Sequence, residues 1–302
     1  MCRSSVPSRE FGRAPVYEEH YGFLEPPFRI TPDPRFLYLT RSHRDALAYL
    51  TYGINERKGI LVVTGEVGVG KTLMVRALME QLPETVRTAV VMNARLTFLQ
   101  LLYLALLDFG IQPPGRNKVD LLICLQGFLL RLSERGTTAV LVVDEAQTLT
   151  PDSLEEFRLL SNLETSTHKL LQVLLVGQPE LKATLNQHAL RQLRQRIPGI
   201  CDLSRIPSES IGEYIEHRLN VASAGRCTRL FSPGGVAFVA RYAEGIPRLI
   251  NQVCDRSLLV GYAQGADRIE EDHVRQAVRE LDEGYVGLGT SGSRSEILVR
   301  EP

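Results

Sequence analysis

The sequence has no excess of charge of either sign, because 35 lysine and arginine residues balance 35 aspartate and glutamate residues among 302. A neutral chain presents no global field for nucleic acid or for an anionic membrane, so only a local basic patch could serve such partners. Paired cysteines are lacking too. The five cysteines are scattered, at Cys2, Cys124, Cys201, Cys227 and Cys254. This spacing fits neither a zinc site nor a disulfide framework, and we interpret them as reduced thiols of a cytosolic protein.

Long apolar runs are absent as well. The start, 1–8, has no apolar stretch after its basic residue, so no secretory signal is predicted. The longest apolar segment, 96–107, is interrupted by Thr97, Gln100 and Tyr103. It is too short to cross a bilayer, and we expect a largely buried helix there. A hydrophobic content of 44% is ordinary for a globular protein, with room for one medium domain and a smaller one.

The most informative pattern that is present is a glycine-rich loop. Residues 65–72 read Gly-Glu-Val-Gly-Val-Gly-Lys-Thr, after an apolar run at 60–64 and before a helical pattern at 73–81. Glycines in such a P-loop let the backbone wrap so that its N–H groups point at phosphate oxygens. The lysine then reaches the β- and γ-phosphates, the threonine hydroxyl serves Mg²⁺, and the helix N-terminus attracts the anion. The predicted nucleotide-binding residues are Gly65, Glu66, Val67, Gly68, Val69, Gly70, Lys71, Thr72 and Leu73.

Two acids follow a second apolar pattern. Residues 139–143 are apolar throughout, as in a parallel strand buried on both faces, and Asp144 and Glu145 come next. We expect Asp144, with Thr72, to hold Mg²⁺ and Glu145 to polarise the attacking water. The alternative is a strand that merely ends in solvated acids. A strand candidate at 87–92 lies between the two motifs in the chain, an order that resembles the additional-strand ATPases.

Strand and helix patterns alternate from about 40 to 205, and only helices follow. The expected elements are strand 59–64, helix 71–82, strand 87–92, helices 96–109 and 118–135, strand 139–144, helix 151–162, strand 170–176, helix 179–195, strand 200–203 and helices 208–222, 232–244, 247–264 and 270–282. The alternation predicts an α/β fold with a parallel sheet and helices on both faces. The predicted domains are a disordered start at 1–15, an α/β nucleotide-binding domain at 16–205 with an aromatic and proline-rich start, a helical lid at 206–283 and a flexible tail at 284–302.

Two more residues are candidates for phosphate contact. Gln178 follows the apolar strand 170–176, so its amide is expected beside Asp144, where it could bind the γ-phosphate or the lytic water. The alternative is a glutamine in a strand-to-helix turn. Arg248, in Gly-Ile-Pro-Arg, lies in the first turn of a predicted helix, where a positive charge is unfavourable. This conflict indicates an anionic partner, and we expect a nucleotide held between the domains.

Three arginines, Arg191, Arg194 and Arg196, cluster at the end of the predicted helix 179–195. Cations at this place stabilise the helix dipole, which is the simple structural interpretation. The other is an arginine finger for the nucleotide of a neighbouring subunit, because a guanidinium suits developing phosphoryl charge. We favour Arg196 over Arg194 for that role. The proline-rich segment 23–38 is extended by its Pro-Pro and Asp-Pro steps, and it is expected either to pack on the sheet or to contact the adenine.

As a set, these motifs closely resemble the AAA+ ATPases, which have a P-loop α/β domain and a C-terminal helical lid. The segments 21–39 (Tyr-Gly-Phe-Leu-Glu-Pro-Pro-Phe-Arg-Ile-Thr-Pro-Asp-Pro-Arg-Phe-Leu-Tyr-Leu) and 42–50 (Ser-His-Arg-Asp-Ala-Leu-Ala-Tyr-Leu) narrow the resemblance to the ExeA type, that is general secretion pathway protein A and its relatives in pilus and exopolysaccharide loci. The resemblance implies ATP hydrolysis with Mg²⁺, a homo-oligomer, and service to a secretion, pilus or export machine. It also implies a cytoplasmic protein that reaches the inner membrane through a partner.

Other interpretations stay open. Secretion members of the family continue into a membrane helix and a peptidoglycan-binding part, and this sequence ends at Pro302 with neither. A direct role in remodelling the cell wall is therefore expected only if a partner supplies the missing parts. The runner-up is an ATP-dependent, DNA-binding regulator of transposition, whose core pattern is similar. The neutral charge argues against it, since backbone binding needs clustered lysine and arginine. The third is a degenerate ATP-binding scaffold, which the intact Asp144 and Glu145 disfavour.

Overall fold

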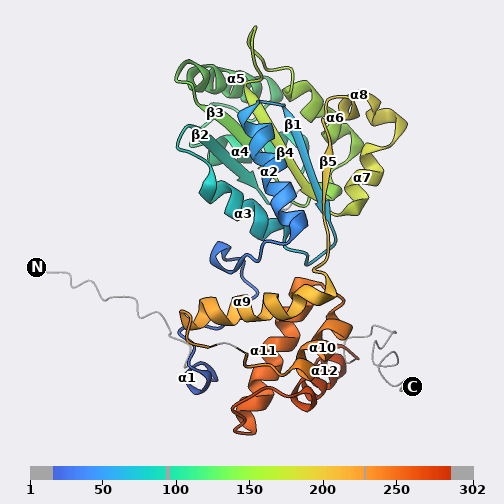
Figure 1. The fold of residues 1–302 in the computed structure, drawn as a ribbon. Coiled ribbons are helices and arrows are strands. Elements are labelled where there is room, and N and C mark those ends of the chain that lie inside the picture. Colours follow the sequence, from blue (N-terminus) through green and yellow to red (C-terminus); the bar gives the residue numbers. More distant parts are fainter. Residues whose placement is uncertain (1–15, 93–95, 228, 287–302) are drawn as a thin grey trace, which may run out of the picture. The chain divides into compact units, whose positions relative to one another are not determined.

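The computed structural model describes residues 16–92, 96–227 and 229–286 (Figure 1). Contacts divide these residues into two compact units. The α/β unit comprises 31–206 together with Ile246–Arg248, and the helical unit comprises the other described residues. The predicted disordered start at 1–15, Cys2, and the tail after 286 lie outside the described residues.

The α/β unit is built on a parallel five-stranded sheet in the order β2-β3-β4-β1-β5. Its strands are β1 (Ile60–Gly65), β2 (Val86–Val91), β3 (Thr138–Val143), β4 (Leu171–Gly177) and β5 (Ile200–Leu203). Each predicted strand is confirmed to within one residue. In the chain β2 comes between the P-loop strand and the acidic strand, but in the sheet β4 lies there and β2 is at the edge.

Alternate residues of the strands face two separate cores. On one face Leu61, Val63 and Val142 pack with α2 (Arg41–Asn55) and α3 (Lys71–Gln81). On the other face Val62, Leu141 and other strand residues pack with the helices that follow β2 in the chain. These are α4 (Phe98–Asp108), α5 (Lys118–Glu134), α6 (Pro151–Leu160), α7 (Pro179–Leu185) and α8 (Arg191–Arg194). Side chains on both faces are buried, which explains why the strands are continuous apolar runs. The predicted three-layer fold is confirmed.

Side-chain caps start several of these helices. Thr40, Asn117 and Thr150 each accept a backbone N–H three residues on, and Thr97 forms a reciprocal capping box with Gln100. Such caps satisfy N–H groups that a helix leaves without partners at its start. The capped helix α2 was absent from the elements expected from the sequence.

The predicted helix 179–195 is wrong in its length. The structure has α7, then a short 3₁₀ turn at His188–Leu190, and then α8. Four leucines explain the break, because Leu181, Leu185, Leu190 and Leu193 are all buried in the same core. In one continuous helix the five-residue step from Leu185 to Leu190 would rotate the second pair away from the core. Breaking the helix keeps both pairs inside.

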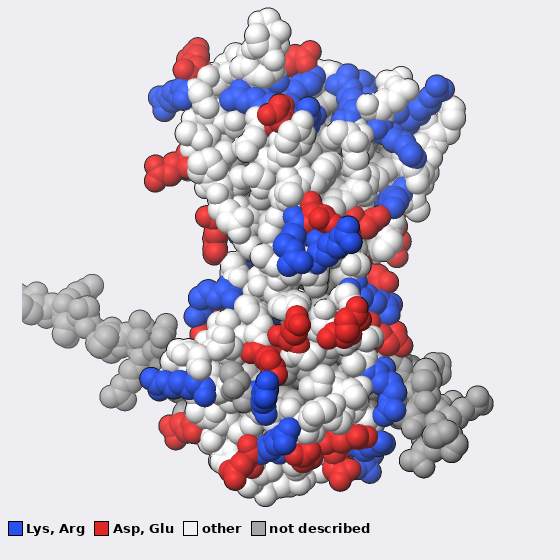
Figure 2. Space-filling view, in the orientation of Figure 1, with Lys and Arg blue, Asp and Glu red and all other residues white. Residues whose placement is uncertain are grey.

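The helical unit contains α1 (Glu18–Tyr21), α9 (Ile211–Ser223), α10 (Pro233–Ala243), most of α11 (Pro247–Ala263) and α12 (Glu271–Val286). The four helices expected from the sequence are present, and α12 runs into the first residues of the predicted tail. No helix in the described ranges has the length and apolar character to span a bilayer. Figure 2 shows acidic and basic side chains interspersed on the visible face of this unit.

Residues 16–30 make their contacts within the helical unit, whereas the sequence analysis assigned them to the α/β domain. Arg218 of α9, 4% exposed, explains this packing because its guanidinium donates to the carbonyl oxygens of Pro27 (2.7 Å) and Arg29 (3.4 Å). The Leu24 N–H donates to the carbonyl of Ala222 at 2.9 Å. A buried guanidinium needs such acceptors, so the segment completes the unit's core.

Candidate nucleotide-binding site

The P-loop links β1 to α3 and has the conformation that its glycines permit. Gly68 and Gly70 have φ of 84° and 100°, a left-handed region that L side chains rarely adopt. The loop also has close neighbours, since a Cβ on Gly68 would lie 2.9 Å from Cβ of Arg248, and one on Gly65 would lie 3.0 Å from the carbonyl oxygen of Leu203. Both backbone conformation and space therefore require glycine here.

Lys71 is the first residue of α3, and it is 7% exposed. Its Nζ donates to the carbonyl oxygens of Gly65 (2.8 Å) and Glu66 (2.9 Å). Burial lowers the pKa of the Lys71 ammonium, while the carboxylates of Glu145, Asp144 and Glu180 oppose that shift. A charged ammonium that is buried with only carbonyl partners can gain from an anionic ligand. This arrangement fits a phosphate group at the loop.

Two contacts that the sequence analysis missed support the P-loop. His43 of α2 is buried; its Nδ1 lies 2.6 Å from Oγ1 of Thr40, and its ring hydrogen bonds the backbone of Val69. Burial lowers the pKa of the His43 imidazole, and the bond to Val69 partly opposes this. Arg205, after β5, donates from Nε (3.0 Å) and Nη2 (2.7 Å) to the carboxylate of Glu66. The contacts of His43 and Arg205 with the loop have no local sequence signal, because the loop residues that they meet are far from them in the chain.

The predicted metal ligands are in contact. Oγ1 of Thr72 donates to Oδ2 of Asp144 at 2.8 Å, and Asp144 is 5% exposed. Mg²⁺ prefers hard oxygen ligands and is commonly held by one or two protein oxygens together with phosphates and water. A hydroxyl and a carboxylate that already meet beside the P-loop fit that requirement. We therefore keep Thr72 and Asp144 as candidate ligands.

Glu145 and two glutamines form a hydrogen-bonded group at the ends of β3 and β4. Oε2 of Glu145 accepts from Nε2 of Gln147 (2.6 Å) and from Nε2 of Gln178 (3.4 Å). Oε1 of Gln147 accepts the backbone N–H of Gln178 at 3.0 Å. We call Asp144, Glu145, Gln147 and Gln178 the strand-end cluster. The structure brings Gln178 to this strand end, as expected, but its recorded contact is with Glu145 and not with Asp144. It also adds Gln147, whose only sequence signal is an amide soon after Asp144-Glu145.

Arg248 is the second residue of α11, and it contacts the P-loop. Its backbone N–H donates to the carbonyl of Gly68 at 3.2 Å, and its Cδ would lie 3.6 Å from a Cβ on that glycine. The side chain is exposed. Among the described contacts, no carboxylate neutralises its guanidinium, so a phosphate remains a suitable partner for it.

The three clustered arginines lie elsewhere in the α/β unit. Nη1 of Arg196 donates to Asn162 Oδ1 (2.6 Å), to Ser161 Oγ (2.8 Å) and to the carbonyl of Arg158 (3.4 Å), all at the C-terminal end of α6. Arg191 and Arg194 are exposed. A helix of ten residues such as α6 is about 15 Å long, and α6 starts shortly after Glu145. The structure does not bring Arg196 to the nucleotide site of its own chain.

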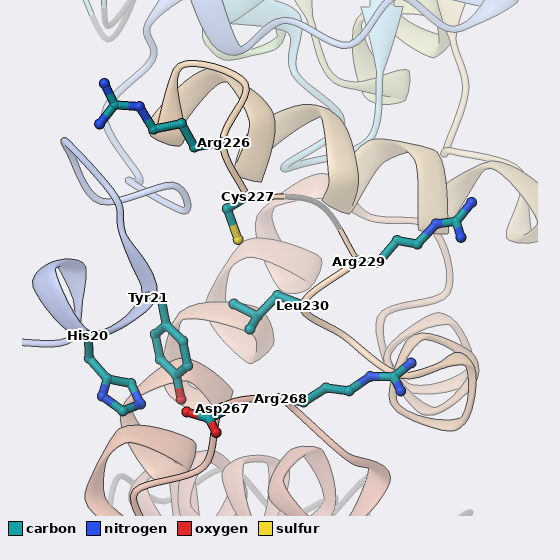
Figure 3. A pocket seen from close by; sticks show the side chains of 8 residues that line it. All are labelled: His20, Tyr21, Arg226, Cys227, Arg229, Leu230, Asp267 and Arg268. Carbon is teal, nitrogen blue, oxygen red and sulfur yellow. The ribbon is translucent and has the colours of Figure 1, made fainter.

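A separate hollow of about 370 Å³ lies in the helical unit. It is lined by His20, Tyr21, Arg226, Cys227, Arg229, Leu230, Asp267 and Arg268. Figure 3 shows that the guanidinium of Arg226 points away from those of Arg229 and Arg268. Burial, together with the charge of Asp267, raises the pKa of Tyr21 to about 12. Because the cations diverge, we assign no ligand to this hollow.

Fold and site together define a P-loop nucleotide-binding protein with the additional strand β4 beside the P-loop strand. Comparison with known proteins agrees: the AAA domain family model matches residues 54–185. The chain is 40% identical over 274 residues to general secretion pathway protein A of Aeromonas hydrophila. The match covers 89% of this chain and 50% of that protein, so the chain spans about half the length of this curated relative. The chain therefore contains an AAA domain and is similar, over most of its length, to the ExeA type of AAA+ protein that this relative represents.

Solved structures of low identity show the same fold. Cdc6p from Pyrobaculum aerophilum superposes with a TM-score of 0.68 at 22% identity, over 90% of this chain and 75% of that chain. The ORC2 protein of Aeropyrum pernix, solved as ADPNP and ADP complexes, gives a TM-score of 0.65 at 19% identity, over 91% of this chain and 74% of that chain. These similarities support the architecture alone.

Proposed function

We propose that this protein binds ATP with Mg²⁺ at the P-loop and hydrolyses it. In the reaction a water oxygen bonds to the γ-phosphorus while the bond from that phosphorus to the β,γ-bridging oxygen breaks. ADP leaves with the electron pair, and Glu145 accepts the proton of the water. The observation that carries the proposal is the direct contact of Thr72 with Asp144, next to a Glu145 carboxylate oriented by two amides.

Each residue has a separate task in this proposal. Backbone N–H groups of 65–73 and the ammonium of Lys71 bind the phosphates, and Arg248 adds a second cation. Thr72 and Asp144 would hold Mg²⁺, which would supply positive charge to offset that of the phosphates. The amide of Gln178, which donates to Glu145 at 3.4 Å, would detect whether a γ-phosphate is present.

We further propose that the protein works as a homo-oligomer in which an arginine of one subunit completes the site of the next. The sequence pattern alone favoured Arg196. Its three hydrogen bonds to the end of α6 now favour a structural task for Arg196, and the exposed Arg194 becomes the better candidate. A finger must be able to leave its own subunit, and a guanidinium with satisfied donors is held in place.

Substitution of Glu145 by Gln tests the hydrolysis. Glutamine keeps the size of the side chain but cannot accept a proton, so we expect unchanged ATP affinity and loss of turnover by about a hundredfold or more. Phosphate release and fluorescent-nucleotide titration measure the two quantities. Glu134→Gln, at the exposed end of α5, is the matched control. Normal hydrolysis by Glu145→Gln would remove Glu145 from the role of base.

The cellular role that we propose is that of an accessory ATPase for a secretion, pilus or exopolysaccharide-export system. The 40% identity to general secretion pathway protein A supports it. On this proposal the protein works in the cytoplasm and approaches the inner membrane through a partner. Genes for components of such a machine beside its own gene are the expected observation, and a neighbouring transposase gene would contradict it.

DNA binding in a regulator of transposition is the second candidate. Figure 2 shows lysine and arginine side chains gathered at the end of the α/β unit that carries α5 and α8, with fewer acidic ones among them. Arg191 and Arg194 of α8 are exposed. Retention on duplex DNA that needs ATP and weakens steeply with salt would support this candidate, because phosphate contacts release counterions.

A further inference from the structure

Gln147 is a candidate for a role that the nucleotide-binding motifs do not include. It lies in a 3₁₀ turn, Ala146–Thr148, directly after the two acids that follow β3. Both ends of its amide are engaged: the donor meets Oε2 of Glu145 at 2.6 Å, and the acceptor takes the backbone N–H of Gln178 at 3.0 Å. The side chain of Gln147 therefore links Glu145, the proposed general base after β3, to the loop that follows the neighbouring strand β4.

The surrounding backbone is shaped to allow this link. Glu145 has φ of 57°, a left-handed conformation that is costly for a residue with a Cβ and that places its carboxylate beside the turn. Gly177, at the end of β4, leaves room for the amide, because a Cβ there would lie 3.0 Å from Oε1 of Gln147 and 3.2 Å from its backbone nitrogen. The strained backbone of Glu145 and the space beside Gly177 therefore both allow Gln147 to reach its two partners.

Both amide donors meet the same carboxylate oxygen of Glu145. Gln147 and Gln178 donate to Oε2, and within the described part of the chain no donor is recorded for Oε1. The carboxylate plane is thereby fixed with one oxygen left to accept a proton from water. The shorter bond is the one from Gln147, so Gln147 has the larger share in this orientation.

We propose that Gln147 is a positioning residue for hydrolysis, which orients the Glu145 carboxylate and couples it to the loop of Gln178. This inference rests on the proposed function, since it requires Glu145 to be the base. Misplacing a catalytic group costs turnover without costing ground-state binding. A residue that only supported the fold of the loop would change ATP affinity and thermal stability as well.

The test uses the full chain with two substitutions of Gln147 that keep its length. Gln147→Met removes both ends of the amide, and Gln147→Glu keeps the acceptor for Gln178 but removes the donor to Glu145. We expect kcat to fall about tenfold to a hundredfold in both variants. The dissociation constant for ATP and the melting temperature should stay near those of the wild type. Gln126→Met, on the exposed face of α5, is the matched control.

The outcomes separate this inference from the proposed function. The positioning role of Gln147 is overturned if kcat of Gln147→Met and Gln147→Glu stays within about twofold of the wild type. If Glu145→Gln is inactive in the same assay, the proposed role of Glu145 as the base still holds. Faster turnover in either Gln147 variant also overturns the positioning role, because Gln147 would then hold Glu145 away from the water. Equal losses of ATP affinity and kcat would assign Gln147 to the support of the loop. Full activity of Glu145→Gln would overturn both proposals.

Discussion

The P-loop and the strand-end cluster lie side by side but are assembled differently. The P-loop is eight consecutive residues, and Lys71 reaches carbonyl groups only five and six positions earlier in the chain. The strand-end cluster joins residues 31 and 33 positions apart, which meet because β3 and β4 pair in parallel, with Val143 opposite Leu175. A local loop can form wherever its own sequence permits, whereas the cluster requires the correct sheet.

Because the two regions offer different chemical groups, we expect them to control different measured quantities, ATP affinity and turnover. The P-loop offers N–H groups and an ammonium, which attract phosphate whether or not a reaction follows. The strand-end cluster offers carboxylates and amides, which repel or merely contact a phosphate but can hold a cation and take a proton. We expect changes in the P-loop to reduce binding and turnover together, and changes in the cluster to reduce turnover alone.

The largest effect is expected from Lys71→Ala, which tests the expectation that the P-loop controls both ATP binding and turnover. Removing the ammonium leaves phosphate charge without its nearest cation, so ATP affinity should fall by about a hundredfold and turnover should be lost. Fluorescent-nucleotide titration and phosphate release measure both quantities. Because Lys71 is buried, the melting temperature must be measured as a control for folding. Retained affinity with lost turnover would erase the distinction between the two regions.

Arg194→Ala should resemble a change in the strand-end cluster, although it lies in a different part of the unit. An arginine that meets the nucleotide of a neighbouring subunit acts on the transition state, so turnover of the assembled protein should fall by about a thousandfold with ATP affinity unchanged.

Arg196→Ala should instead lower stability by about 1–3 kcal/mol, because it leaves the acceptors at the end of α6 unpaired. If Arg196→Ala alone lost turnover and its stability stayed normal, Arg196 would be the arginine finger.

Acidification should weaken the P-loop through His43. An unfolded histidine titrates near pH 6.5, and burial lowers the pKa of His43 in the fold, so the unfolded chain binds more protons below about pH 6.5. Stability is therefore complete above that pH and is lost as the pH falls through the lower pKa of the folded state. His43→Gln should reduce the loss of melting temperature between about pH 7.5 and about pH 5.5.

His217 of α9 is the matched control for this pH dependence. Burial, with the charge of Arg218, lowers the pKa of His217 as well, but it belongs to the helical unit. His217→Gln should also reduce the acid-induced loss of stability. Only His43→Gln should preserve ATP affinity at low pH. Equal effects of both variants on affinity would show that His43 has no special relation to the loop.

The smallest effect is expected from Glu66→Gln. The side chains of Arg205 and Glu66 are 40% and 48% exposed, and exposed ion pairs contribute about 0–1 kcal/mol. ATP affinity should change by no more than about twofold, and the difference from the wild type should vanish at high salt. A large loss of ATP affinity would mean that the ion pair of Arg205 and Glu66 orders the P-loop. The conformation of the P-loop would then depend on a residue far along the chain.

Much of the α/β unit was predictable because burial on both faces leaves long apolar runs. Strand 139–144 was expected from such a run and was found as β3. The errors have a common cause. The break between α7 and α8 and the packing of 16–30 with the helical unit depend on contacts far along the chain, as those of Leu190 and Arg218 show. Gln147 and His43 were missed for the same reason, since neither belongs to a local pattern.

The amino-acid sequence by itself determined the P-loop, its helix and the apolar strands, because glycine conformations, helix caps and hydrophobic runs act over a few residues. Only the tertiary structure decided which polar groups meet at the strand ends. The order β2-β3-β4-β1-β5 places the end of β3 next to the end of β4, and so brings the amides of Gln147 and Gln178 to Glu145. Hydrogen bonds across strands depend on register, and register is a property of the whole sheet.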